Sequence, residues 1–129
     1  MTKIETPPPV LPRLRLRITL AGGDWLGPGK ADLLAGIAET GSISAAGRRM
    51  GMSYKRAWGL VEVLNAMFAQ PLVTASRGGA GHGGAALTDS GREVLRLYGN
   101  MQAKADAALA GEIGQIAGLA SALDMSGRK

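Results

Sequence analysis

The 129-residue chain contains no cysteine, a single histidine and few aromatic residues, which make up only 4% of it. The lack of cysteine excludes disulfides and thiolate metal sites. The single histidine and the scattered carboxylates show no spacing typical of a metal site or of a catalytic constellation. We therefore expect no metal, no cofactor and no enzymatic activity, and a core built from Leu, Ile, Val, Ala and Met.

The sequence also has no long apolar run. No stretch approaches the ~20 residues that a membrane span requires, and the first ten residues, MTKIETPPPV, lack the apolar segment of a signal peptide. These absences, together with the absence of cysteine, predict a cytoplasmic protein that does not enter a membrane.

Basic residues outnumber acidic ones by 15 to 10, which gives a formal net charge of +5. A basic balance favours polyanionic partners such as nucleic acid. The segment between Gly41 and Arg92 concentrates this charge, because only Glu62 and Asp89 are acidic there. Its basic residues are Arg48, Arg49, Lys55, Arg56, Arg77 and Arg92. This concentration favours a nucleic-acid surface over a generally solubilising charge.

The N-terminal part predicts an arm followed by a strand. Residues 1–12 contain four prolines, which is typical of a flexible, extended arm. Residues 13–20 alternate strictly between polar and apolar, and a period of two predicts a half-buried strand. Its outward face carries Arg13, Arg15 and Arg17, which could contact phosphates, although such a face is more often only solvated.

Residues 21–68 predict a loop and three helices. Four glycines and Pro28 make 21–29 a loop, although Pro28 could also pre-set the start of the next helix. An apolar stripe over 30–40 predicts that helix, which Gly41 ends. Ser42 or Ser44 is the expected cap of a short helix that reaches Met50.

After the break at Gly51, Ser53 is the expected N-cap of a longer helix over about 54–68. Its buried stripe consists of Ala57, Leu60, Val61, Leu64 and Met67. Trp58 lies beside this stripe, so we assign it to the core rather than to stacking on a base.

A glycine-rich hairpin and a long helix follow. Short β segments at 72–75 and 85–87 flank residues 76–84, in which five of nine residues are glycine. Thr88, Asp89 and Ser90 offer cap side chains for the next helix, and Ser90 with Glu93 fits the capping-box spacing. This helix runs to about residue 110. The glycines beyond it lower helix propensity, so 111–129 is expected to be a weakly helical tail.

The order helix, turn, helix, hairpin, helix predicts a winged helix-turn-helix. The expected fold is mainly α (α+β): an N-terminal strand, a three-helix core, a β-hairpin wing and a long C-terminal helix, all in one domain over 13–110. In such a domain the first turn of the second helix reaches base edges and phosphates in the major groove. The expected DNA contacts are Ser42, Ser44, Arg48, Arg49, Ser53, Tyr54, Lys55 and Arg56 in the helices, and Arg77, Gly78, Gly79, His82 and Gly83 in the wing.

The glycine-rich loop at residues 76–84 could also have other functions. It lacks the spacing of a Walker loop and of a dinucleotide fingerprint, so a nucleotide-binding enzyme is disfavoured. Glycines in a hairpin permit close approach to a sugar-phosphate backbone, with Arg77 and His82 supplying contacts. The alternative is an inert hairpin tip, and His82 alone is weak evidence.

Over roughly residues 14–109 the sequence resembles the N-terminal DNA-binding domain of the ModE family of molybdate-dependent transcriptional regulators. It is more broadly similar to LysR-type winged helices. The runs that carry the resemblance are ETGSISAAGRRMGMSYKRAWGLVEVLN, LVTASRGGAGHGGAALTDSG and REVLRLYGNMQAKAD. The wing departs from the family pattern at Ala80, Gly81 and His82, where a lysine is common, so the base preference is expected to differ.

The resemblance implies a homodimer on palindromic operator DNA, paired through the long helix with help from the first strand. The implied dimerisation residues are Val94, Leu95, Tyr98, Met101 and Ala105. Full-length ModE proteins continue into a molybdate-binding module, so a link to molybdate regulation is implied. Because this sequence stops at Lys129, molybdate binding by the chain itself is doubtful. The alternative function is an effector-less partner that heterodimerises with a full-length regulator through its long helix.

Overall fold

The computed structural model describes residues 13–76 and 84–127, with side chains of the last helix described as far as residue 120. Backbone packing divides the chain into two units, one of residues 15–102 and one of residues 1–14 and 103–129. The predicted arm at 1–12 lies outside the described residues. The elements are β1 Ile18–Thr19, β2 Trp25–Leu26, α1 Pro28–Thr40, α2 Ile43–Arg49, α3 Tyr54–Met67, β3 Val73–Ser76, β4 Gly84–Leu87, α4 Asp89–Ala108 and α5 Ala110–Gly127.

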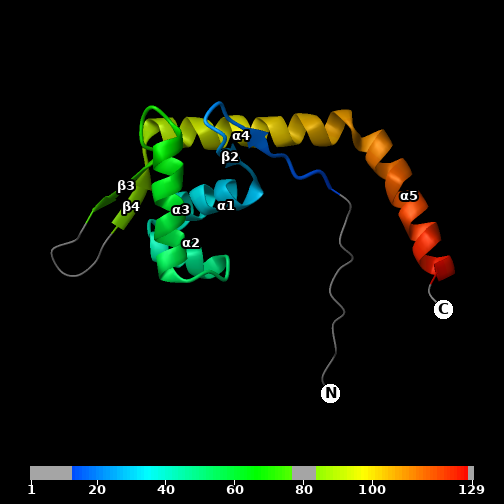
Figure 1. The fold of residues 1–129 in the computed structure, drawn as a ribbon, viewed down its shortest axis with the longest axis horizontal. Helices are drawn as coiled ribbons and strands as arrows, with labels where there is room; N and C mark the ends of the chain where they lie inside the picture. The colour runs from blue at the N-terminus through cyan, green and yellow to red at the C-terminus, as the bar shows by residue number, and fades with distance from the viewer. Residues whose placement is uncertain (1–12, 77–83, 128–129) are drawn as a thin grey trace, which may run out of the picture. The chain divides into compact units, whose positions relative to one another are not determined.

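Helices α1, α2 and α3 form the predicted three-helix core, and within this unit the hairpin β3–β4 extends from the side of α3 (Figure 1). Helix α1 begins at Pro28, whose fixed φ suits the first helical position. It ends at Gly41, which has a φ of +72° and donates its N–H to the Ile37 carbonyl at 2.8 Å. The buried face of α1 includes Leu33, Leu34 and Ile37, which supply the centre of the core.

Glycines bring α2 close to its neighbours. A Cβ added at Gly47 would lie 2.7 Å from the Cβ of Ala57 on α3, and one at Gly36 of α1 would lie 3.0 Å from the Cβ of Ala46 on α2. The turn after α2 passes through Gly51, whose φ of +73° is the left-handed conformation that glycine adopts readily. The helix-turn-helix angle therefore depends on residues that lack a side chain.

The side-chain amide of Asn65 joins α3 to the hairpin. Its Oδ1 accepts hydrogen bonds from the backbone N–H groups of Leu72 (2.8 Å) and Val73 (3.0 Å), and its Nδ2 donates to the Val73 carbonyl (3.1 Å). Strands β3 and β4 pair antiparallel from Val73↔Leu87 to Ser76↔Gly84. The sequence analysis gave Asn65 no role, yet this residue fixes where β3 begins relative to α3.

Helix α4 is capped by Thr88, one of the three cap candidates that the sequence offers. The Thr88 hydroxyl accepts from the Gly91 N–H at 2.9 Å and donates to the Pro71 carbonyl at 2.7 Å. Ser90 lies inside the helix and Glu93 pairs with Arg96, so the predicted Ser90–Glu93 capping box is wrong. Thr88 is the N-cap because its hydroxyl can bond both to the first turn of α4 and to the carbonyl of Pro71.

The predicted N-terminal strand over 13–20 is much shorter in the structure. Only Ile18 and Thr19 pair, with Leu26 and Trp25 of β2, a partner that the sequence analysis placed in a loop. The alternation of burial is confirmed, because exposed and half-buried residues alternate from Arg15 to Leu20. A pattern of side chains predicts which face is covered, whereas a strand also needs a neighbouring backbone to pair with.

Trp25 carries a second set of contacts at this end of α1. The Lys30 Nζ lies 3.4 Å and the Arg17 Cζ 4.5 Å from the centroid of its ring, both within cation–π range. Lys30 is only 7% exposed, and this burial lowers the pKa of its ammonium group, with the nearby Asp24 carboxylate opposing the shift. The indole of Trp25 therefore takes part in holding a desolvated cation beside the β1–β2 pair.

The C-terminal segment differs from the prediction of a weakly helical tail. Helix α5 covers Ala110–Gly127, so the glycines at 111, 114 and 118 do not prevent a helix. The residues between them include the good helix formers Glu112, Gln115 and Ala117, which offset part of the cost of glycine. Ile116 and Leu119 of α5 are exposed. The predicted domain limits at 13 and 110 stay a prediction; the division at Gln102 falls inside α4.

Within residues 13–76 and 84–127, no helix has the length and hydropathy needed to cross a bilayer. The same part of the chain contains no group of three or more His, Asp or Glu side chains arranged to hold a metal ion.

We predict that Gly47→Ala destabilises the fold by about 1–3 kcal/mol, because the added methyl group overpacks the contact with Ala57. Urea unfolding followed by circular dichroism measures the change. Gly99→Ala is the matched control, since a Cβ at Gly99 of α4 meets nothing within 4 Å and alanine favours the helix by about 1 kcal/mol. Equal effects of the two substitutions would contradict the close approach of α2 and α3.

Candidate nucleic-acid interface

The first turn of α3 presents the predicted basic residues to solvent. Ser53 is the N-cap, as predicted, and its Oγ accepts the backbone N–H of Arg56 at 3.1 Å. Tyr54, Lys55 and Arg56 are exposed, Tyr54 to 63%. A helix N-terminus carries partial positive charge from its free N–H groups, so the two full charges and the dipole have the same sign here. This end of α3 is therefore suited to an anionic partner.

Helix α2 supplies a second set of the predicted contacts. The Oγ of Ser42 accepts the Ala45 N–H at 3.0 Å, so this hydroxyl caps α2. Arg48 and Arg49 are exposed, as predicted. The Nη2 of Arg49 forms an ion pair with Glu39 at 2.8 Å, and an exposed pair of this kind is worth little free energy in water. Arg49 can therefore exchange Glu39 for another anion at low cost.

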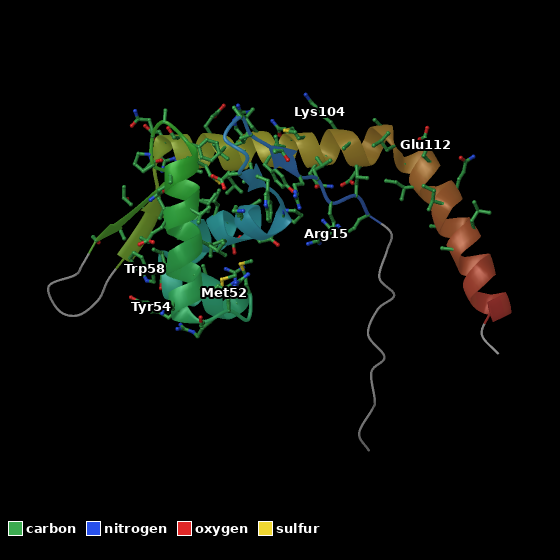
Figure 2. All side chains as sticks on the ribbon, in the orientation of Figure 1. Arg15, Met52, Tyr54, Trp58, Lys104 and Glu112 are labelled. Atoms are coloured by element: carbon green, nitrogen blue, oxygen red, sulfur yellow. The ribbon has the colours of Figure 1, made fainter. Side chains whose placement is uncertain are left out.

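A cavity of about 220 Å³ brings several predicted residues together. Ser42 and Ser44 at the start of α2, Tyr54 at the start of α3 and Ser76 at the described end of β3 line it. Figure 2 shows Tyr54 and Trp58 near the end of α3 that lies away from α4. The cavity thus brings together residues of α2, α3 and the β3–β4 hairpin, whose proximity the sequence alone does not show.

Trp58 packs against the core, as predicted, and also lines this cavity. Its ring meets the Tyr54 ring edge to face, with centroids 6.0 Å apart and planes at 62°. In the described part of the chain its indole N–H is buried and has no hydrogen-bond partner. The Trp58 ring therefore packs against the Tyr54 ring and helps to orient the tyrosine at the rim of the cavity.

The predicted wing contacts cannot be placed. Arg77, Gly78, Gly79, His82 and Gly83 lie outside the described residues. The strands that flank them are described to Ser76 and from Gly84, and Ala85 donates its N–H to the Gly41 carbonyl at 2.9 Å. The beginning of β4 is therefore anchored to Gly41, which lies between α1 and α2.

The outward side of α3 holds a shallow groove that the sequence analysis did not predict. It measures about 470 Å³ and is lined by Ser53, Lys55, Arg56, Gly59, Leu60 and Val63. Its walls are mainly apolar beyond the first turn, and Val63 is 39% exposed. The sequence signal was an apolar residue and a glycine on the helix face opposite the buried Ala57, Val61 and Leu64.

The predicted apolar seam on α4 needs correction. Tyr98 is only 8% exposed and its hydroxyl donates to the Leu16 carbonyl at 2.8 Å, so it belongs to the core of its own protomer. Val94 and Leu95 also pack against that core, and Ala105 is half-buried. The exposed apolar residues of α4 within the 15–102 unit are Leu97 (46%) and Met101 (41%). Leu97 was missed, although it stands one helical turn before Met101.

Comparison with known proteins agrees with this architecture. Residues 30–92 match the bacterial regulatory helix-turn-helix proteins of the lysR family. The chain is 47% identical over 81 residues to the molybdenum-pterin-binding protein MopB of Rhodobacter capsulatus, covering 63% of this chain and 30% of MopB. It is 41% identical over 71 residues to the DNA-binding transcriptional dual regulator ModE of Escherichia coli K12, covering 55% of this chain and 27% of ModE.

The molybdenum transport protein ModE of Azotobacter vinelandii is 33% identical over 95 residues, which cover 74% of this chain and 35% of that protein. The chain thus spans about a third of the length of the curated relatives that it matches. Residues 30–92 thus match a helix-turn-helix of the lysR type, and over this part of its sequence the chain resembles the ModE proteins.

Proposed function

We propose that this protein is a transcriptional regulator that binds double-stranded DNA as a homodimer, on a palindromic site, with α3 in the major groove. The observation that carries the proposal is the exposed first turn of α3, where Lys55 and Arg56 extend from a helix N-terminus that Ser53 caps. In a helix-turn-helix this turn reaches base edges. Arg56 is the residue proposed to read a base, because a guanidinium pairs bidentately with guanine.

The phosphate contacts are proposed to come from the elements around α3. Arg48 and Arg49 at the end of α2 supply charge, and the hydroxyls of Ser44, Tyr54 and Ser76 supply donors at the rim of the 220 Å³ cavity. Such contacts set the register of a protein on DNA and carry no direct base information. The wing residues Arg77, Gly78, Gly79, His82 and Gly83 are proposed to contact the sugar-phosphate backbone as well.

The biological setting is proposed from the relatives. Their names connect MopB with molybdenum-pterin binding and the ModE proteins with transcriptional regulation and molybdenum transport. We therefore propose that the regulated genes are concerned with molybdenum or molybdate, and that the protein acts in the cytoplasm, where bacterial DNA lies. No residue of the described chain is assigned to molybdate.

The dimer is proposed to form through α4. Leu97 and Met101 are four residues apart, so they lie on the same face of the helix. Two exposed apolar side chains in this arrangement can pack against the same residues of a second copy around a two-fold axis. The pairing would give two α3 helices, as a palindromic site requires.

We expect Arg56→Ala to lower affinity for the best duplex selected from a randomised pool by about 1–3 kcal/mol, and to relax specificity at one base pair. The fold is unaffected, because the cap bond to Ser53 uses the backbone N–H of residue 56. Gel shifts on matched and singly mismatched duplexes measure both effects. Arg96→Ala on α4 removes the same charge elsewhere, and an equal loss for both variants would remove Arg56 from base readout.

The affinity for DNA should fall steeply with salt. Neutralising each phosphate contributes about 0.9 to the slope of log affinity against log salt concentration, so two basic contacts per protomer of a dimer predict a slope of about −3.6 or steeper. Fluorescence anisotropy between low and physiological salt measures this slope. A flat dependence would show that DNA is not the partner.

We predict that Leu97→Asp converts the dimer to a monomer, because the seam would bury an unpaired carboxylate. Light scattering after size exclusion should give twice the 13.2 kDa chain mass for the wild type and once that mass for the variant. Val63→Asp makes the same change at an exposed apolar site on α3 and should stay dimeric. A wild-type monomer that does not bind DNA alone would instead favour heterodimerisation with a separate regulator.

A further inference from the structure

The groove on the outward side of α3 has a chemical character that phosphate binding does not explain. Beyond its basic end at Lys55 and Arg56, its lining is Gly59, Leu60 and Val63. Val63 is 39% exposed, and a Cβ built on Gly59 would meet nothing within 4 Å. The groove therefore has an open floor at Gly59 and an apolar wall at Val63.

Gly59 is notable because glycine inside a helix is destabilising relative to alanine. Gly47 and Gly36 are required by close packing against a neighbouring helix, but no neighbour of Gly59 requires the missing side chain. The effect of glycine at this position is instead on the surface, where it lets another molecule approach the backbone of α3.

The apolar lining of the groove on α3 suits one chemical group in the DNA major groove, the methyl group of thymine. Most groups that bases present there are hydrogen-bond donors and acceptors, and the exception is the 5-methyl group of thymine, which makes apolar contacts. Val63 offers carbon surface, and so does the exposed part of Leu60, which is half-buried against the core rather than fully buried as predicted; neither has a hydrogen-bonding side-chain atom. Lys55, beside Arg56 at one end of the groove, complements the phosphates that border a base step, which favours DNA over an apolar protein segment.

We propose that Gly59, Leu60 and Val63 form a thymine-methyl site, in which Gly59 lets the base edge approach α3 and Val63 packs against the methyl group. The inference rests on the proposed function, since it assigns to α3 a second kind of base readout beside Arg56. It makes A·T pairs at defined positions of each half-site a specificity determinant that needs no hydrogen bond.

The test begins with the full chain and the best duplex from a randomised pool. Each thymine of one half-site is then replaced by deoxyuridine, which removes the methyl group and leaves the Watson–Crick pairing. At one or two positions the affinity should fall about three- to fivefold, as expected for the burial of one methyl group. Deoxyuridine outside the half-sites is the control and should leave the affinity unchanged.

Two variants identify the side of the protein that senses the methyl group. Val63→Ala should lose about threefold on the thymine duplex and nothing further on the deoxyuridine duplex, so that the two changes are not additive. Gly59→Ala should raise the Tm by about 2–5 °C, because alanine favours the helix, yet lower the affinity for the thymine duplex at least fivefold. A purely structural role for Gly59 predicts the rise in Tm without the loss of binding.

The outcomes separate this inference from the function on which it rests. If the wild type selects no sequence from the pool, the proposed function fails. If it selects a site but the half-sites lack thymine, or deoxyuridine costs nothing at any position, the thymine-methyl site is overturned and the proposed function stands. Additive losses for Val63→Ala and deoxyuridine would likewise overturn the pairing of Val63 with the methyl group.

Discussion

The contact between Gly47 of α2 and Ala57 of α3 is the constraint on which the rest of the candidate interface depends. A Cβ at Gly47 would stand 2.7 Å from the Cβ of Ala57, so the two helices meet almost backbone to backbone. That approach fixes the direction of α3, and the positive φ of Gly51 lets the chain turn sharply enough to reach it. The exposed first turn of α3 is a consequence of packing on the opposite side of the helix.

Much of the winged helix could be predicted because its signals are local. Pro28, Gly41, Ser42 and Ser53 mark helix ends through the conformation and hydrogen bonds of one or two residues, and all four occupy the predicted places. The hairpin likewise follows from a glycine-rich loop between two apolar segments. These features need no knowledge of which elements meet in space.

The features that the sequence did not predict, such as the roles of Tyr98 and Asn65, depend on contacts with residues distant in sequence. Tyr98 follows the apolar period of α4, but whether it faces a second protomer or its own core depends on the Leu16 carbonyl, 82 residues away. Asn65 carries no pattern at all, and only the position of β3 shows that its amide has three backbone partners. The groove at Gly59 and Val63 lies on the face of α3 opposite its buried residues. Its position therefore depends on which face of α3 packs against the core, which the three-dimensional structure decides.

The three hydrogen bonds of Asn65 have a geometric consequence for the proposed binding of α3 to DNA. They hold the start of β3 against the last turns of α3, while Ala85 ties β4 to the loop before α2. Helix α3 and the two strands of the hairpin are thus held at a fixed spacing, which would not change with the DNA sequence that is bound. A site in which the two contact regions are spaced differently must bend or twist to fit, so the flexibility of intervening base pairs would be read as energy.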